Sequence, residues 1–106
     1  MSIDVVHKTR MCYEQRRDIF NNGVVQLALM NIPEGGDIPN EVHVDNTQIT
    51  TIVEGNALVK LDGGKTTFLL NEGQCVIIDK GRYHQIINIG DVPLKLYSFY
   101  IPPEED

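Results

Sequence analysis

Turn-forming residues interrupt this chain at short, regular intervals from Val24 to Pro103. These frequent breaks restrict the possible folds more than any other feature of the sequence. Clusters of Gly, Pro, Asn and Asp separate about eight apolar, β-branched runs at spacings of roughly 8–12 residues, which is typical of an all-β sandwich or barrel. Breaks this frequent leave no room for the helices that a parallel α/β sheet needs between its strands. The sequence therefore predicts an all-β fold.

The expected strands are short runs rich in Val, Ile, Thr and aromatic residues. They cover residues 24–32, 41–44, 48–55, 56–62, 65–70, 74–79, 84–89 and 94–101. Residues 34–40 are expected to form a loop, and the best helical candidate is the stretch 11–20.

A chain of 106 residues can build one hydrophobic core but not two, so we expect a single domain, residues 1–106. We assign residues 1–23 to an N-terminal segment, 24–101 to the barrel and 102–106 to a solvated acidic tail.

The charge and composition exclude several classes of partner. A net charge of −6 would repel phosphates, which argues against a nucleic-acid partner. No apolar run approaches the roughly 18 residues of a membrane span, and the first ten residues lack the apolar core of a signal peptide. Cys12 and Cys75 are too few and too far apart for a disulfide framework or a cysteine-based zinc site. We therefore expect a cytoplasmic protein with two reduced thiols.

Two of the three histidines have neighbours that suggest a metal site. His43 is two residues from Glu41, so on a strand both side chains point to one face. His84 follows a tight turn and opens a strand on which Asn88 shares its face. Two imidazoles and one carboxylate are the smallest set for a facial iron(II)-type site with open positions. We read His7, near the chain terminus, as an ordinary exposed histidine.

A longer pattern around these residues resembles the first motif of the cupin superfamily. That motif reads Gly, five residues, His-x-His, three or four residues, Glu, six residues, Gly. The stretch "GGDIPNEVHVDNTQITTIVEG" fits this spacing, with Gly35 and Gly55 at its ends, Glu41 at the place of the first His, His43 at the second and Gln48 at the Glu place.

The second cupin motif follows in the correct order and spacing. It reads Gly, five residues, Pro-x-Gly, two residues, His, three residues, Asn, and "GQCVIIDKGRYHQIIN" matches with Gly73, Gly81, His84 and Asn88, while Asp79 replaces the Pro. Seventeen residues separate the two motifs, as in small single-domain microbial cupins. The resemblance implies a cupin double-stranded β-helix, or jelly-roll barrel, with loop-forming glycines and an Asn88 that hydrogen-bonds to loop backbone.

The resemblance also implies a metal-ligand set of Glu41, His43, Gln48 and His84 for a divalent transition metal (Fe, Mn, Zn or Ni). Two ligand identities differ from the usual three His and one Glu, although the formal ligand charge stays at −1. Gln48 has two readings, because its amide oxygen can bind a metal directly or its side chain can hydrogen-bond a metal-bound water or Glu41. A third reading is a metal-free site in which the four polar groups satisfy one another.

Strand alternation predicts which other side chains face the same interior. The expected pocket wall is small and mostly apolar, although its members can equally be core residues. It comprises Met30, Thr50, Ile86, Leu96, Ser98 and Tyr100. No cluster of Arg or Lys reaches this set, so a phosphate or polycarboxylate substrate is not favoured.

We expect a metal-binding cupin that acts on a small organic molecule, with oxygenase chemistry ahead of isomerase or lyase chemistry. The alternatives are a non-catalytic module that binds a small ligand or a metal, and a structural homodimer with a vestigial cavity. A homodimer is expected in each case, because the outward strand faces carry many apolar residues and the N-terminal segment can pack across the partner. These outward residues are Val24, Leu27, Leu29, Ile49, Thr51, Val53, Tyr97 and Phe99.

Overall fold

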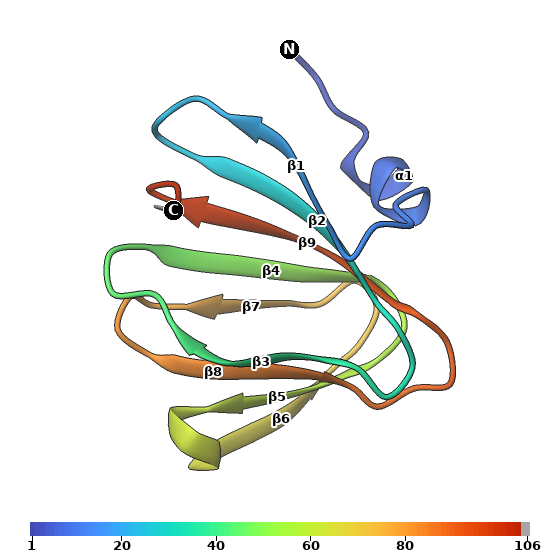
Figure 1. Cartoon of the computed structure of the whole chain (residues 1–106), viewed down its shortest axis with the longest axis vertical. Coiled ribbons are helices and arrows are strands. Elements are labelled where there is room, and N and C mark those ends of the chain that lie inside the picture. Colours follow the sequence, from blue (N-terminus) through green and yellow to red (C-terminus); the bar gives the residue numbers. More distant parts are fainter. Residues whose placement is uncertain (105–106) are drawn as a thin grey trace.

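The computed structural model describes residues 1–104, which fold into two antiparallel sheets that face each other, with one short helix outside them (Figure 1). The elements are α1 (Val5–Arg10), β1 (Arg16–Asn21), β2 (Gln26–Ile32), β3 (Asp37–Val42), β4 (Thr47–Glu54), β5 (Ala57–Leu61), the 3-10 turn η1 (Asp62–Gly64), β6 (Thr66–Leu70), β7 (Cys75–Ile78), β8 (Tyr83–Asn88) and β9 (Leu94–Ile101). The predicted all-β class is confirmed. Within residues 1–104, no helix is long and apolar enough to cross a membrane.

The strand order is that of a jelly-roll barrel. One sheet has the order β1-β2-β9-β4-β7 and the other the order β3-β8-β5-β6, so β2 lies beside β9 and β3 beside β8 although each pair is distant in sequence. Every one of these pairings is antiparallel. The double-stranded β-helix predicted from the sequence is thereby confirmed. The pairing of β3 with β8 places residues 41 and 84 opposite each other.

The core lies between the two sheets and follows the strand period of two. Inward residues of β5 and β8 are buried while their neighbours are half-exposed. The core cluster comprises Ile32, Ile38, Ile52, Ala57, Val59, Leu61, Leu70, Val76, Ile78, Ile86, Leu94 and Leu96. These apolar side chains form the hydrophobic core between the two sheets.

The expected helix over residues 11–20 is wrong. The helix α1 covers Val5–Arg10 instead, and Arg16–Asn21 forms the strand β1. The side chain of Asp4 caps the N-terminus of α1, where its Oδ1 accepts a hydrogen bond from the backbone N–H of His7 at 3.1 Å. The ten residues 11–20 have little intrinsic preference, so pairing with β2 decides their conformation.

The strand β1 also differs from the assignment of residues 1–23 to a segment outside the barrel. We expected this segment to lie outside the barrel and to pack across a partner, whereas β1 pairs with β2 of the same chain. An edge strand needs only one neighbour and tolerates polar side chains, which is why its residues are mostly exposed. The expected loop 34–40 likewise becomes strand from Asp37 onward because β8 pairs with it.

Asn88 connects two chain segments at one end of the barrel, residues 32–33 and 90–92, as the resemblance to the second cupin motif predicted. Its Nδ2 donates to the carbonyl oxygens of Ile32 at 3.0 Å, Pro33 at 3.2 Å and Val92 at 3.0 Å. Its Oδ1 accepts from the Gly90 N–H at 2.9 Å. Asn88 is therefore a structural residue whose polar atoms are used by the backbone.

Candidate metal centre

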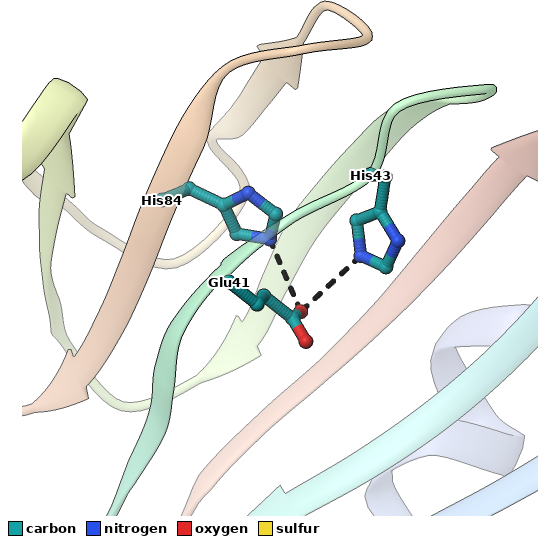
Figure 2. A group of neighbouring side chains, drawn as sticks. All are labelled: Glu41, His43 and His84. Carbon is teal, nitrogen blue, oxygen red and sulfur yellow. Dashed lines mark hydrogen bonds and ion pairs between the residues drawn. The ribbon is translucent and has the colours of Figure 1, made fainter.

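Three side chains converge inside the barrel, and Figure 2 shows them pointing toward one another. The Nε2 atoms of His84 and His43 lie 3.1 Å and 3.3 Å from the Oε1 atom of Glu41. One ligand atom from each of the three residues lies within 4.8 Å of the others. The two imidazole rings are stacked, with centroids 5.3 Å apart. The arrangement is therefore a compact set of two nitrogens and one carboxylate oxygen.

The strand register brings the three residues together. Glu41 in β3 is directly opposite His84 in β8, after an irregularity in the pairing between Ile38 and Glu41. His43 follows the end of β3, and its carbonyl oxygen accepts a hydrogen bond from the Gly81 N–H at 2.8 Å. Gly81 has a φ of +84°, which a side chain would disfavour. The turn at Gly81, which belongs to the second motif, thus fixes the backbone of His43, which belongs to the first.

The outer nitrogen of each imidazole faces an acceptor. Nδ1 of His84 lies 3.4 Å from the Arg82 carbonyl oxygen, and Nδ1 of His43 lies 3.5 Å from Oε2 of Glu104. Metal-binding histidines commonly donate their second N–H to such groups. With the proton on Nδ1, each neutral ring directs a lone pair from Nε2 toward the Glu41 carboxylate. Three converging acceptors repel one another unless a cation lies between them, so this donor set fits a metal ion.

The carboxyl group of Glu41 is held in its ionised form. Without a cation, a proton on Nε2 of His84 can be donated to Glu41 instead; this hydrogen bond, together with the charge that His43 and His84 carry when protonated, keeps the pKa of Glu41 below its ordinary value, although burial acts in the opposite direction. His84 is fully buried, and the His43 side chain is 16% exposed. The Glu41 side chain is 41% exposed, so one side of the cluster is open to an entering ion or ligand.

Gln48 lies in β4, on the other sheet, and is almost fully buried. Its Nε2 donates to the Thr50 hydroxyl at 2.8 Å, and that hydroxyl is 2.7 Å from the Ser98 hydroxyl. Among the described residues, its Oε1 is a buried acceptor with no hydrogen-bond partner. A buried oxygen without a donor is costly, and a cation or a water molecule would satisfy it.

The residues expected to form a pocket wall separate into three groups. Met30 and Tyr100 line a hollow of about 190 Å³ together with Glu41. Thr50 and Ser98 belong to the buried hydrogen-bonded chain that starts at Gln48. Ile86 and Leu96 are fully buried in the core cluster. The inward face of β9 expected from the sequence, which carries Leu96, Ser98 and Tyr100, is the buried one.

Tyr100 lies next to the converging residues, with its ring centroid 5.6 Å from that of His43. Burial, and to a lesser degree the negative charge of Glu104, raises the pKa of Tyr100 well above its ordinary value. The phenol therefore stays protonated at neutral pH and can donate a hydrogen bond, but it does not supply a phenolate base.

Two charged residues that the sequence analysis missed also reach this region. The Arg16 guanidinium lies over the Tyr100 ring at 5.3 Å from its centroid, and its Nη2 donates to Oε1 of Glu104. Glu104 is only 18% exposed in its side chain, so the expectation of a solvated tail is wrong for this residue. The sequence analysis expected no cluster of Arg or Lys at the pocket and did not foresee the single Arg16, which lines the 190 Å³ hollow. No local pattern signals a contact between positions 88 residues apart.

Comparison with known proteins agrees with this geometry. Residues 28–100 match the family described as Cupin domain. An uncharacterized protein of Acanthamoeba polyphaga mimivirus is 40% identical over 91 residues, covering 84% of this chain and 57% of its own length. The chain spans about half the length of the curated relatives it matches, 57% of that protein and 44% of YrkC from Bacillus subtilis.

A solved structure extends the likeness to the whole chain. The crystal structure of the BH2720 protein from Bacillus halodurans covers 100% of this chain and 83% of its own, with a TM-score of 0.96 and 29% identity. A double-stranded β-helix protein from Klebsiella pneumoniae covers 96% of this chain and 90% of its own, with a TM-score of 0.79 and 20% identity, and supports the fold alone.

Proposed function

We propose that this chain, which belongs to the cupin domain family, binds one divalent transition metal and acts on a small organic molecule at that metal. One observation carries the proposal: Glu41 in β3, His43 just after β3 and His84 in β8 bring one oxygen and two nitrogens within 4.8 Å of one another. This ligand set suits Fe, Mn, Zn or Ni, and it leaves coordination positions open for a ligand.

When bound, such a metal would supply Lewis acidity toward a carbonyl or enolate oxygen, or activation of dioxygen, so we place oxygenase chemistry ahead of isomerase or lyase chemistry. The residues of the chain have separate tasks. Glu41 contributes the negative charge of the site, and the acceptors at Nδ1 of His43 and His84 orient the two rings. The protonated phenol of Tyr100 donates a hydrogen bond to a ligand in the adjoining hollow.

Gln48 is proposed as the fourth ligand or as the anchor of a metal-bound water. Its unpartnered Oε1 supports either role. A metal would supply the positive charge that this oxygen lacks, and a metal-bound water would supply a hydrogen-bond donor. The hydrogen bond from its Nε2 to Thr50 fixes which end of the amide is available. The Thr50 and Ser98 hydroxyls would then act as supports for Gln48 and not as contacts of the substrate.

A non-catalytic module that binds a small ligand or a metal is the second candidate. The observation that favours it is the ion pair between Arg16 and Glu104, which occupies space beside the cluster and would restrict access to it. An enzyme must let its substrate reach the metal, whereas a storage or sensing module needs only the metal or one small ligand.

The deciding experiment begins with elemental analysis of protein purified without chelator. Stoichiometric Fe, Mn, Zn or Ni supports the metal proposal, and no bound metal after reconstitution with each ion refutes it. Metal-loaded protein is then tested for oxygen uptake and product formation with a panel of small carbonyl and enol compounds. Turnover supports the enzyme, whereas tight binding without turnover supports the binding module.

We also propose a homodimer that buries the outer face of the five-stranded sheet. Ile49 in β4 is opposite both Ile77 in β7 and Phe99 in β9, so the three side chains form a continuous apolar stripe. Ile77 is 59% exposed, and a second copy would cover it. The stripe is smaller than the sequence suggested, because Leu27, Leu29 and Val53 are already buried within the chain.

A reducing cytoplasmic location is proposed from the two thiols. Cys12 is buried and Cys75 is exposed, and both are free. An exposed free thiol is disfavoured in oxidising compartments. Thiol titration of freshly isolated protein should find both cysteines reduced, and a disulfide-linked species would contradict the proposal.

A further inference from the structure

Arg16 and Glu104, from opposite ends of the described chain, form an ion pair beside the metal centre. Nη2 of Arg16 donates to Oε1 of Glu104, and Oε2 of the same carboxylate lies 3.5 Å from Nδ1 of His43. The side chains are 34% and 18% exposed. A single carboxylate thus has a guanidinium at one oxygen and an imidazole at the other, and proteins use this arrangement to bind the carboxylate of a small ligand.

This ion pair also lies between two hollows. The larger, of about 590 Å³, is lined by His43 and by the tail residues Pro102, Pro103 and Glu104. The smaller, of about 190 Å³, is lined by Arg16 together with Glu41 and Tyr100. Because Glu104 lines one hollow and contacts Arg16 in the wall of the other, displacement of the Glu104 side chain would open a path between the hollows beside His43 and Glu41.

Arg16 is well placed to receive an anion. Among the described residues that line either hollow, it is the only lysine or arginine. Its guanidinium is held over the Tyr100 ring at 5.3 Å and by Oδ1 of Asp18 at 3.1 Å, so its position does not depend on Glu104 alone. A ligand carboxylate could therefore replace that of Glu104 without rebuilding the site.

Residues 102–104 are held mainly by side chains. Pro102 and Pro103 have no N–H to donate, and the Glu104 N–H donates to Oε1 of Gln26 at 2.9 Å. A segment attached in this way opens more easily than a strand held by a full ladder of backbone hydrogen bonds.

We propose that Arg16 binds the carboxylate of a small monocarboxylate ligand, and that Glu104 occupies this position until the ligand displaces it. This inference rests on the proposed function, because it places the remainder of the ligand beside Glu41, His43 and His84. Exchange of one carboxylate for another leaves the net charge around Arg16 unchanged. A second carboxylate would face Glu41 and Asp37 in the smaller hollow, so a monocarboxylate fits better than a dicarboxylate.

The test compares pyruvate with its neutral methyl ester by calorimetry on Mn²⁺-loaded protein. Glu104→Ala should bind pyruvate about tenfold more tightly than the parent, because the internal competitor is gone. Arg16→Gln should bind pyruvate about tenfold more weakly and should no longer prefer it to the ester. Arg17→Gln is the matched control, since it removes an exposed arginine of the same strand that lines neither hollow, and it should change affinity by less than about threefold.

A second measurement separates this inference from the metal proposal. In metal-free protein, the Nε–H resonance of Arg16, identified with Arg16→Lys, should shift on pyruvate addition, and at lower concentrations in Glu104→Ala. A shift without any metal binding supports the Arg16 site and refutes only the metal proposal. Metal binding with equal pyruvate affinity in the parent, Glu104→Ala and folded Arg16→Gln or Arg16→Lys proteins overturns the inference and leaves the metal proposal standing.

Discussion

His84 and Glu41 are 43 residues apart in the chain, yet Nε2 of His84 lies 3.1 Å from Oε1 of Glu41 because β3 and β8 pair at these positions. The pair joins the two sequence motifs into one site. His84 is fully buried, whereas the Glu41 side chain is 41% exposed, so the nitrogen is fixed by packing and the carboxylate can adjust to an ion.

Replacement of His84 by Ala should abolish stoichiometric metal binding. The variant loses one of two nitrogen ligands, and the expected drop in affinity exceeds about 100-fold, since even changes to residues that merely support a ligand cost 10–100-fold. The measurement is elemental analysis after dialysis against buffered metal. His7→Ala, which changes an exposed histidine on α1, should bind metal like the parent. Equal metal content in folded His84→Ala and parent protein would rule out the site.

Gln48→Leu should weaken metal binding by about 10–100-fold while Gln48→Glu should retain or strengthen it. Leu removes the buried Oε1 acceptor, whereas Glu restores the carboxylate usual at this position of the cupin motif. Competition with a metal chelator of known affinity gives both values. Unchanged affinity in Gln48→Leu would show that the Gln48 side chain neither binds the metal nor supports it.

Asn88→Ala should destabilise the fold by about 2–4 kcal/mol, because it leaves buried loop carbonyl groups without a donor. Urea unfolding monitored by circular dichroism measures the change. Asn56→Ala is the control, since the Asn56 side chain makes an exposed hydrogen bond to Asn71, and it should cost less than about 1 kcal/mol. Comparable losses in the two variants would contradict the anchoring role of Asn88.

The raised pKa of Tyr100 leads us to expect that the protein loses stability at alkaline pH. Its pKa is raised in the folded protein, so the contribution of the neutral phenol is fully present below the unfolded value of about 10 and declines as the pH rises above it. Unfolding free energies measured from pH 8 to 11 should fall more steeply in the parent than in Tyr100→Phe. Tyr83→Phe, at a 52% exposed tyrosine, should follow the parent. Identical slopes for all three proteins would show that Tyr100 titrates normally.

Sedimentation should give a particle of about twice the 11.9 kDa of one chain. Ile77→Lys places a charge in the apolar stripe formed with Ile49 and Phe99 and should shift the equilibrium toward monomer. Leu69→Lys changes an equally exposed leucine on the other sheet and should leave the mass unchanged. A parent protein that remains a monomer at micromolar concentration would refute the dimer.

The sequence alone determined the fold class, the two motifs and the identity of three converging residues. Strand alternation is a local property with a period of two, so it was enough to mark Leu96, Ser98 and Tyr100 as inward, and all three side chains are buried. The resemblance to the second cupin motif implied that Asn88 anchors a loop, and its four hydrogen bonds to backbone agree.

The tertiary structure decided what depends on contacts between distant positions. Residues 16–21 form a strand because they pair with β2, and the helix expected over residues 11–20 had too little local preference to compete with that pairing. Glu104 was expected in a solvated tail and no role was assigned to Arg16, but the closure of the barrel brings the two side chains together beside His43. The positions of whole strands decide which charged side chains form such ion pairs, and no short pattern of residues encodes them. The contact of Arg16 and Glu104 with the site could therefore be seen only in the folded chain.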